Sequence, residues 1–299
     1  MLQSRCARDR AEQKARHDDR GARYDAHRMD IDPAHRHPHD VWTGADDYER
    51  YIGRWSRPVA RAFVPWMGVA PGAHWLDVGC GAGALTATIA ELAEPAGVLG
   101  VDPSEPYLAR AREMLGSPRV SFQVGDAEAL PAADGSYDVV VAGLVLNFVP
   151  DAPAALAEWR RVTRAGGAIG GYVWDYAGEM QLLRYFWDAA VALDADVRAL
   201  DEGVRFPIAR PGDLAGAFES AGLAQVTTRA IEVPTHFADF EDLWQPFLGG
   251  HGPAPAYVMS LPAARREALR DRLHVGLPVG QDGSIDLTAR AWAVRGLRQ

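Results

Sequence analysis

Hydrophobic and polar positions follow a repeating pattern between residues 74 and 174. Short runs of apolar residues alternate with stretches that have the helical period of 3.6 residues. The predicted strands cover 74–78, 97–102, 120–125, 137–144 and 168–174, and the predicted helices cover 84–93, 105–115 and 153–162. Strands that are apolar on both faces and alternate with helices are typical of a parallel sheet covered on both sides. The pattern therefore predicts an α/β fold with a doubly wound sheet.

The pattern changes after residue 174. Residues 179–193 predict an amphipathic helix, and the earlier rhythm returns with a helix at 211–221 and strands at 225–233 and 285–295. The two interruptions, at about 177–208 and 235–280, are predicted to be insertions that form a helical lid. The lid and its borders are rich in aromatic residues, namely Trp174, Tyr176, Tyr185, Phe186, Trp187, Phe237, Phe240, Trp244, Phe247 and Tyr257. They predict an apolar or aromatic substrate pocket, while most of them are expected to pack the lid onto the domain.

The N-terminal segment has a different composition from the rest. Residues 1–40 are rich in charged side chains and histidine and almost lack large apolar residues, so we expect a disordered tail. Residues 41–299 are predicted to form a single domain. Near its start, Tyr48, Tyr51 and Trp55 recur at helical spacing, and Pro58 is expected to begin a second helix.

Composition excludes several classes of function. The net charge of −9 over 299 residues argues against a nucleic-acid partner, which requires a basic surface. No run of 18 apolar residues is present, so no membrane span is expected. The two cysteines, Cys6 and Cys80, do not form a disulfide framework, which is typical of a reducing compartment and predicts a cytoplasmic protein.

A glycine-rich loop follows the first predicted strand. Asp77 ends an apolar run, and Gly79-Cys80-Gly81-Ala82-Gly83 leads directly into a predicted helix. The glycines let backbone N–H groups approach a ligand, and the helix N-terminus favours negative charge. The spacing also fits a dinucleotide fingerprint, which leaves an NAD-dependent oxidoreductase as an alternative. However, Asp77 would repel a pyrophosphate, whereas it suits a ligand that carries an ammonium or sulfonium group.

Three carboxylates lie at the ends of three successive predicted strands. Asp77, Asp102 and Asp126 are each separated by about one strand–helix unit. In a doubly wound sheet the carboxyl ends of the strands meet at one edge, where ligands bind. The three carboxylates are therefore expected to line one crevice.

Five segments together resemble the ordered motifs of one enzyme family. Residues 76–83, 101–104, 125–131, 137–140 and 164–167 are similar to the five motifs of class I S-adenosylmethionine-dependent methyltransferases. The resemblance covers about residues 46–232 and points to the small-molecule group that includes ubiquinone and menaquinone biosynthesis enzymes. It implies a Rossmann-like methyltransferase fold with a mostly parallel sheet of seven strands. It also implies S-adenosyl-L-methionine as cofactor and a small-molecule acceptor, with the oligomeric state left open.

The resemblance implies a role for each motif residue at the methionine end of the cofactor. Gly79, Cys80 and Gly81 would present their backbone to the methionine part, and Asp77 would lie near its ammonium group. Leu144, at the end of the fourth predicted strand, would face the sulfonium. Cys80 is interpreted as a small packing residue and not as a nucleophile.

The nucleoside end of the cofactor would be bound by the second and third motifs. Asp102, followed by Pro103, would accept hydrogen bonds from both ribose hydroxyl groups. Asp126 would accept a hydrogen bond from the adenine amino group, with Ala127 packing beside it. Tyr51 would close over the cofactor from the N-terminal side, an interpretation balanced against simple core packing.

The sequence does not identify a general base. Several relatives have a histidine where Asn147 stands here, and an asparagine cannot act as a base. Asn147, His236 and His251 are therefore only candidates for the catalytic role, and both histidines also suit a structural or exposed position. No metal is expected. A non-catalytic protein that binds S-adenosylmethionine remains a further alternative.

Overall fold

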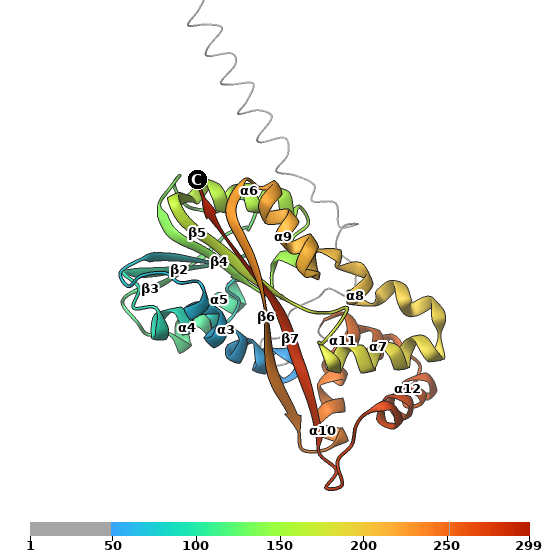
Figure 1. The fold of residues 1–299 in the computed structure, drawn as a ribbon. Coiled ribbons are helices and arrows are strands. Elements are labelled where there is room, and N and C mark those ends of the chain that lie inside the picture. Colours follow the sequence, from blue (N-terminus) through green and yellow to red (C-terminus); the bar gives the residue numbers. More distant parts are fainter. Residues whose placement is uncertain (1–48, 251) are drawn as a thin grey trace, which may run out of the picture. The chain divides into compact units, whose positions relative to one another are not determined.

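The computed structural model describes residues 49–250 and 252–299. The predictions for the tail, for Tyr48 and for His251 lie outside these residues. The described chain contains a sheet of seven strands in the order β3-β2-β1-β4-β5-β7-β6 (Figure 1). The strands are β1 His74–Val78, β2 Gly97–Asp102, β3 Val120–Val124, β4 Tyr137–Gly143, β5 Thr163–Trp174, β6 Leu223–Phe237 and β7 Ile285–Arg298. The doubly wound, mostly parallel sheet is confirmed.

The strand register places the carboxyl ends of β1, β2 and β4 at one edge. β1 lies inside the sheet and pairs in parallel with β2 and β4, so that Asp77 lies opposite Gly100 and Val141. β7 is the exception, because it runs antiparallel to both β5 and β6. Ligands bind at the carboxyl edge of such sheets, next to the strand at which the order reverses. Here that strand is β1, which carries the glycine loop.

Helices cover both faces of the sheet (Figure 1). One face carries α3 Arg54–Trp66, α4 Ala84–Leu92 and α5 Glu105–Met114, and the other carries α6 Ala152–Val162 and α9 Pro211–Ser220. A π-helical turn, η2 Glu49–Gly53, leads directly into α3. The expectation that Pro58 begins a second helix is wrong, because Pro58 lies inside α3. Its missing N–H costs one backbone hydrogen bond of a helix that the buried face of α3 still stabilises.

β6 and β7 are longer than the sequence pattern predicts. They pair from Leu223 and Arg298 as far as Phe237 and Ile285, whereas β5 pairs with β7 only up to Ala291. The far part of this pair therefore extends past the other strands (Figure 1). Ile231, Val233, Thr235 and Phe237 alternate as buried positions, so one face of the extension is covered.

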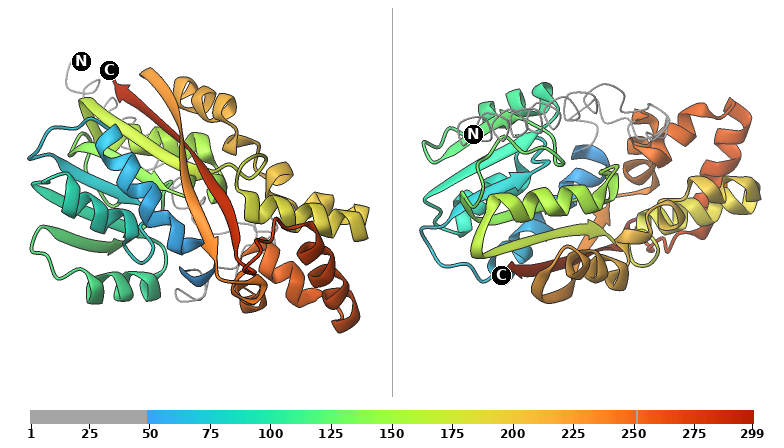
Figure 2. Two further views of the ribbon diagram at one scale, coloured as in Figure 1. Left: turned by 60° about the horizontal axis from the view of Figure 1, so that its bottom comes forward. Right: turned by 90° about the horizontal axis from the view of Figure 1, so that it is seen from above.

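The elements outside the basic fold gather at this extension. Between β5 and α9 lie α7 Gln181–Leu193, η4 Ala195–Leu200, α8 Glu202–Arg205 and η5 Pro207–Ala209. Between β6 and β7 lie α10 Phe240–Trp244, η6 Gln245–Gly249, α11 Pro253–Ser260 and α12 Ala263–Gly276. The two groups pack together, with α12 and α11 against α7 (Figure 2). Among the described helices, none has the length and apolar character that crossing a membrane requires.

Aromatic rings form the contacts between these two groups. Phe186 of α7 stacks on Phe247 with 4.7 Å between ring centroids, and Trp187 lies 5.8 Å from Tyr257. Phe186, Trp187 and Phe247 are fully buried. Such offset aromatic contacts add stability beyond the burial of area. These aromatic residues therefore hold the two groups of helices together.

Candidate functional site

The glycine loop is shaped by one backbone conformation and one close contact. Gly79 has φ +68°, and a Cβ atom at this position would lie 2.5 Å from Val145 Cγ2. Gly81 also has a positive φ, of +52°, but no heavy atom lies within 4 Å of its Cβ position. Gly79 therefore lets the loop pack against the end of β4, while Gly81 leaves open space above the loop. The N–H groups of Gly79 and Cys80 donate to the Val101 carbonyl at 2.7 and 3.0 Å, which ties the loop to β2.

Asp77 is a buried acid beneath this loop. Its side chain is 1% exposed, and one oxygen accepts a hydrogen bond of 2.6 Å from the Thr86 hydroxyl group of α4. The other oxygen, Oδ1, is buried and has no partner among the described residues. Burial raises the pKa of Asp77 to about 7, and the nearby Asp102 carboxylate adds to the rise, while the Thr86 hydrogen bond opposes it. The site therefore holds an acceptor atom that a cationic group would satisfy.

Asp102 lies beside the loop at the end of β2. Its Oδ2 accepts a hydrogen bond of 2.9 Å from the Gly81 N–H group, and its Oδ1 accepts one of 2.8 Å from the Ser104 N–H group. Burial raises the pKa of Asp102, and these two hydrogen bonds oppose the shift. Each carboxylate oxygen retains a second lone pair. Pro103 is exposed next to it.

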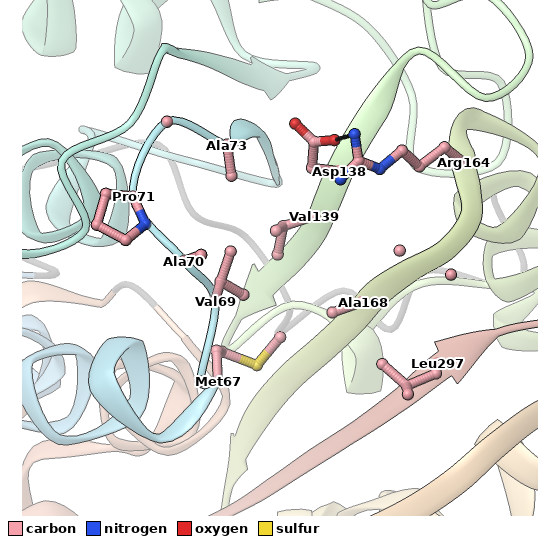
Figure 3. Close-up of a pocket in the computed structure, with 14 residues that line it drawn as sticks. Met67, Val69, Ala70, Pro71, Ala73, Asp138, Val139, Arg164, Ala168 and Leu297 are labelled. Atoms are coloured by element: carbon pink, nitrogen blue, oxygen red, sulfur yellow. Dashed lines mark ion pairs between the residues drawn. The ribbon is translucent and has the colours of Figure 1, made fainter.

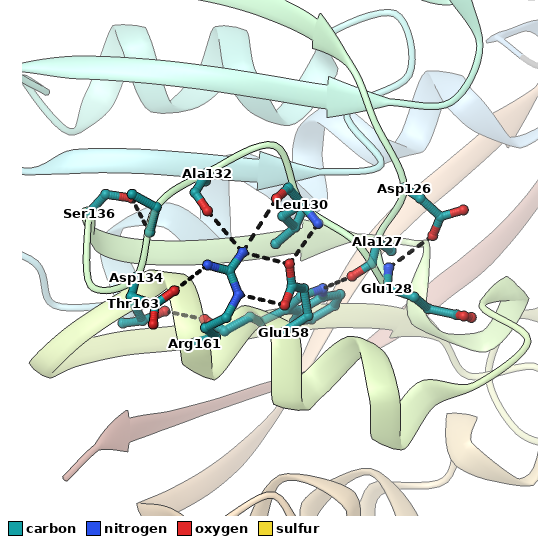
Figure 4. A network of polar contacts seen from close by, with 12 residues as sticks. Asp126, Ala127, Glu128, Leu130, Ala132, Asp134, Ser136, Glu158, Arg161 and Thr163 are labelled. Atoms are coloured by element: carbon teal, nitrogen blue, oxygen red, sulfur yellow. Dashed lines mark hydrogen bonds and ion pairs between the residues drawn. The ribbon is translucent and has the colours of Figure 1, made fainter. Parts of the chain in front are cut away.

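Asp126 lies in an exposed loop that is fixed to α6 (Figure 4). Its carboxylate accepts a hydrogen bond of 2.9 Å from the Glu128 N–H group. The carbonyl of the next residue, Ala127, accepts one of 3.2 Å from the Trp159 indole. Glu158 accepts from the Leu130 N–H group at 2.8 Å and pairs with the guanidinium of Arg161. This pairing lowers the pKa of Glu158.

Arg161 holds the rest of the same loop. It donates to Asp134 and to the carbonyls of Leu130 and Ala132, at 2.5, 3.4 and 2.9 Å (Figure 4). A guanidinium offers five donors in a rigid plane, which suits several acceptors at once. The loop that carries Asp126 is therefore restrained by one helix.

The end of β4 is strained. Leu144 has φ +63°, a left-handed conformation that costs a residue with a side chain about 1–3 kcal/mol. It is buried, and its N–H group donates to the Tyr172 carbonyl at 2.7 Å. Strain of this kind is found preferentially at functional sites. Because Val145 contacts Gly79, this turn lies directly beside the glycine loop.

Asn147 follows in the same turn, within η3 Leu146–Phe148. Its side chain is buried, and Nδ2 donates to the Tyr176 hydroxyl group at 3.5 Å. Its Oδ1 is buried without a partner among the described residues. Asn147 therefore links the end of β4 to the segment that follows β5.

Tyr51 and Cys80 are both buried, with different consequences. Tyr51, in η2, packs edge-on against Phe247 with 5.3 Å between centroids, and its hydroxyl group has no partner among the described residues. Burial raises its pKa, and the charge of Glu202 raises it further. Burial likewise raises the pKa of the Cys80 thiol, so this cysteine does not form a reactive thiolate near neutral pH.

His236 lies far along the extended β6–β7 pair. It pairs with Asp286, while the end of β5 pairs with Ala291, so His236 lies five residues beyond, or roughly 16 Å of strand. Its side chain is 64% exposed and contacts the Asp286 carboxylate at 2.7 Å. The structure does not bring His236 together with the carboxylates of β1 and β2.

A separate cavity of about 300 Å³ lies at the opposite edge of the sheet (Figure 3). It is lined by the connection between α3 and β1, including Val69 and Pro71, and by Asp138 and Arg164 near the starts of β4 and β5. Asp138 and Arg164 form an ion pair. Strands of this fold bind ligands at their carboxyl ends, so the candidate site is the glycine loop and not this cavity.

Sequence reasoning missed four polar residues near the candidate site: Thr86, Glu158, Arg161 and Glu202. Glu158 and Arg161 are three residues apart on a predicted helix, a spacing that allows an ion pair. The sequence pattern does not single out Thr86 or Glu202, because the hydrogen bonds and pKa shifts that involve them depend on burial in the folded chain. Glu202 is 2% exposed and accepts a hydrogen bond from the Trp187 indole.

A glycine turn, a helix N-terminus and carboxylates at the ends of β1 and β2 define a nucleoside-binding class of α/β proteins. Comparisons with known proteins agree. A family profile for a methyltransferase domain matches residues 76–170. The 2-methyl-6-phytyl-1,4-hydroquinone methyltransferase of Synechocystis sp. is 30% identical over 239 residues, which cover 72% of this chain and 73% of that protein.

Further matches are shorter or more distant. The nocamycin O-methyltransferase of Saccharothrix syringae is 42% identical over 120 residues, covering 38% of this chain and 42% of that protein. The crystal structure of the YcgJ protein from Bacillus subtilis shares the fold, with a TM-score of 0.54, 17% identity and coverage of 81% of this chain and 98% of that chain.

The chain belongs to the S-adenosylmethionine-dependent methyltransferases. This membership sets aside the interpretation as an NAD-dependent oxidoreductase. The chain spans only 32% to 49% of the length of several other curated relatives that it matches. The residues that the family profile matches include the glycine loop, Asp102 and Asp126.

Proposed function

We propose that this protein transfers a methyl group from S-adenosyl-L-methionine to a small-molecule acceptor. The observation that carries the proposal is the Asp77 carboxyl group beneath the glycine loop, with one oxygen buried and without a partner among the described residues. Such an atom costs about 1–3 kcal/mol until a donor satisfies it. The ammonium group of the cofactor is such a donor, whereas a pyrophosphate would add a second negative charge.

The other residues fit the remaining parts of the cofactor. The open space above Gly81 allows a ligand to approach the backbone. Asp102, whose oxygens each accept one backbone N–H bond, retains lone pairs for the two ribose hydroxyl groups. Asp126 and Ala127, on the loop fixed by Glu158, are proposed to bind the adenine amino group and ring.

The end of β4 is proposed to separate the cofactor from the acceptor. When bound, S-adenosylmethionine supplies an electrophilic methyl group on a sulfonium centre. Leu144 has a strained, left-handed backbone conformation at the turn beside Gly79. There its apolar side chain would exclude water from the reacting atoms. Tyr51 is proposed to cover the same region from η2.

Two observations support a small acceptor with apolar or aromatic character. Relatives are named for nocamycin O-methylation and for the methylation of a hydroquinone, and both names describe small organic molecules. The elements beside the candidate site carry the aromatic rings of Phe148, Tyr176 and Phe206. A cytoplasmic location remains a prediction from the sequence.

Titration calorimetry with S-adenosylhomocysteine and with NAD tests the cofactor assignment. We expect S-adenosylhomocysteine to bind to the protein and NAD not to bind. Asp102→Ala should weaken binding at least about tenfold, because it removes charge-assisted hydrogen bonds worth about 1.5–3 kcal/mol. Asp271→Ala, an exposed position on α12, is the matched control and should bind normally. Binding of NAD alone would contradict the proposal.

Label transfer distinguishes an enzyme from a non-catalytic cofactor-binding protein. The purified protein is incubated with methyl-labelled S-adenosylmethionine and a bacterial metabolite extract. We expect label in a small molecule that requires the protein and disappears with Asp102→Ala. Binding without any transfer would favour the non-catalytic alternative.

A further inference from the structure

A buried polar cluster lies on the far side of the β4 turn from the glycine loop. Gly79 contacts Val145, and two residues later Asn147 donates to the Tyr176 hydroxyl group at 3.5 Å. The backbone of Tyr176 lies against α8, because a Cβ atom at Gly203 would lie 2.9 Å from the Tyr176 carbonyl oxygen. Glu202 immediately precedes Gly203. A continuous set of contacts thus leads from the cofactor loop to Glu202.

The cluster contains polar atoms that the described part of the chain does not satisfy. The Tyr51 hydroxyl group and the Asn147 Oδ1 atom are both buried without partners, on side chains that are 2% and 8% exposed. Native proteins rarely leave such atoms unpaired in the absence of a ligand or water. The Tyr51 pKa responds to the charges of both Glu202 and Tyr176, so these side chains share one region.

Glu202 has the properties of a proton acceptor at neutral pH. Burial raises its pKa to about 7, opposed by its own backbone N–H group and by the Trp187 indole. Asp201 raises the pKa further, and Arg184, which pairs with Asp201 at 2.9 Å, lowers it. Tyr51 is a further titratable group near it, and burial and the Glu202 charge raise the pKa of Tyr51, so this side chain is neutral at this pH. General bases act best when their pKa lies near the working pH.

The surroundings select among acceptor groups. Phe148 and Tyr176 both contact Phe206, with centroid distances of 5.1 and 5.6 Å, so the region is lined by aromatic rings. An ammonium group would be repelled by the neighbouring sulfonium. An alkyl alcohol is too weak an acid for a carboxylate, whereas a phenol has a pKa of about 10, like tyrosine.

On the basis of the function proposed above, we propose that Glu202 accepts the proton of a phenolic hydroxyl group on the acceptor, and that Asn147 and Tyr51 orient this group by hydrogen bonds. The acceptor oxygen forms its bond to the methyl carbon as the bond from carbon to sulfur breaks. The hydroxyl proton passes to the Glu202 carboxylate, and the sulfur becomes a neutral thioether. The proton leaves to solvent with the product, which restores the carboxylate.

The test uses the full chain with methyl-labelled S-adenosylmethionine and trimethylhydroquinone under anaerobic conditions, with phenethylamine as a second acceptor. Glu202→Gln keeps an oxygen that accepts from the Trp187 indole but cannot take a proton. Glu267→Gln, an exposed position on α12, is the matched control. S-adenosylhomocysteine affinity is measured for every variant to show that the cofactor site is intact.

We expect the wild type and Glu267→Gln to form the methyl ether of trimethylhydroquinone at equal rates. Glu202→Gln should lower kcat at least about 100-fold, while the affinity for S-adenosylhomocysteine changes less than twofold. The wild-type kcat/KM should rise with pH up to about 7, and this rise should vanish in Glu202→Gln.

Three results would overturn the inference while the proposed function stands. The first is a Glu202→Gln rate within threefold of the wild type. The second is methylation of phenethylamine and not of the hydroquinone. The third is normal S-adenosylhomocysteine binding with no transfer to the hydroquinone, which excludes the phenolic acceptor. Failure of the wild type to bind S-adenosylhomocysteine would instead refute the proposed function and, with it, this inference.

Discussion

Replacing Asp77 by asparagine separates the stability of the protein from its binding of the cofactor. The side chain is 1% exposed, and burial raises its pKa from 3.8 to about 7. Asparagine has nearly the same shape and keeps an oxygen for the Thr86 hydroxyl group, but it carries no charge. The substitution should therefore stabilise the free protein and weaken its binding of the cofactor.

The direction of the Asp77 pKa shift determines how the free energy of unfolding changes with pH. Between pH 3.8 and pH 7 the folded protein holds a proton on Asp77 that the unfolded chain has released. The free energy of unfolding therefore falls as pH rises through this window, and the loss is complete above pH 7. A shift of about three pKa units corresponds to at most about 4 kcal/mol. The amide NH2 group of asparagine would itself lack a partner, so we expect a net gain of about 2 kcal/mol at pH 8.

Urea unfolding followed by tryptophan fluorescence measures this difference at pH 5 and pH 8. Asp77→Asn should be more stable than the wild type at pH 8, with a smaller difference at pH 5. Calorimetry with S-adenosylhomocysteine should show binding weakened by about 10- to 150-fold, the equivalent of 1.5–3 kcal/mol. Asp271→Asn is the exposed control and should change neither quantity. The reasoning fails if Asp77→Asn is less stable than the wild type at pH 8, since the carboxylate would then be a net stabilising group.

Three further predictions test the arrangement around the site. Gly79→Ala should lower the free energy of unfolding by about 1–3 kcal/mol in urea unfolding, because its Cβ atom would lie 2.5 Å from Val145. Gly81→Ala should lower it less, because no heavy atom lies within 4 Å of the new Cβ atom. Equal losses for the two variants would contradict the contact with Val145. Arg161→Ala should lower the free energy of unfolding by about 1.5–3 kcal/mol and weaken S-adenosylhomocysteine binding severalfold in calorimetry, because the Asp126 loop loses its restraint. His236→Ala should leave the rate of label transfer within twofold of the wild type, and a large loss would show that this exposed histidine reaches the acceptor.

The central sheet could be predicted from the sequence because each strand carries its own signal. The predicted and observed bounds of β1 and β2 are identical, since both strands consist mainly of buried apolar residues and carry an aspartate at or next to their last position. The same reasoning placed Asp77 and Asp102 at one edge, and the structure agrees, because the charge of Asp102 raises the pKa of Asp77. For these two strands the local sequence pattern agrees with the topology of the sheet, so the sequence alone is sufficient to predict them.

The extension of β6 and β7 could not be predicted in the same way. The sequence indicates strands at 225–233 and 285–295; β7 begins at Ile285 as predicted, whereas β6 continues as far as Phe237. Pro234 directly follows the expected strand, yet it lies within β6 and pairs opposite Thr288. A proline is tolerated in a strand at the edge of a sheet, and β6 is the edge strand. The tolerance depends on the position of the strand in the sheet, which the local pattern does not contain.

Residues proposed to bind the acceptor could not be predicted from the sequence, whereas those proposed to bind the cofactor could, for a similar reason. The proposed cofactor residues lie at or directly after the ends of strands, so their position in the sequence fixes their position at the sheet edge. Glu202 instead lies in a helix of four residues within the first inserted segment, and its surroundings come from η2, α7 and the segment after β5. A glutamate in such a segment is exposed in most proteins, and only packing of the lid makes it a buried acid. The residues that select the acceptor are therefore best sought among buried polar groups of the two inserted segments, where tertiary packing and not motif spacing reveals them.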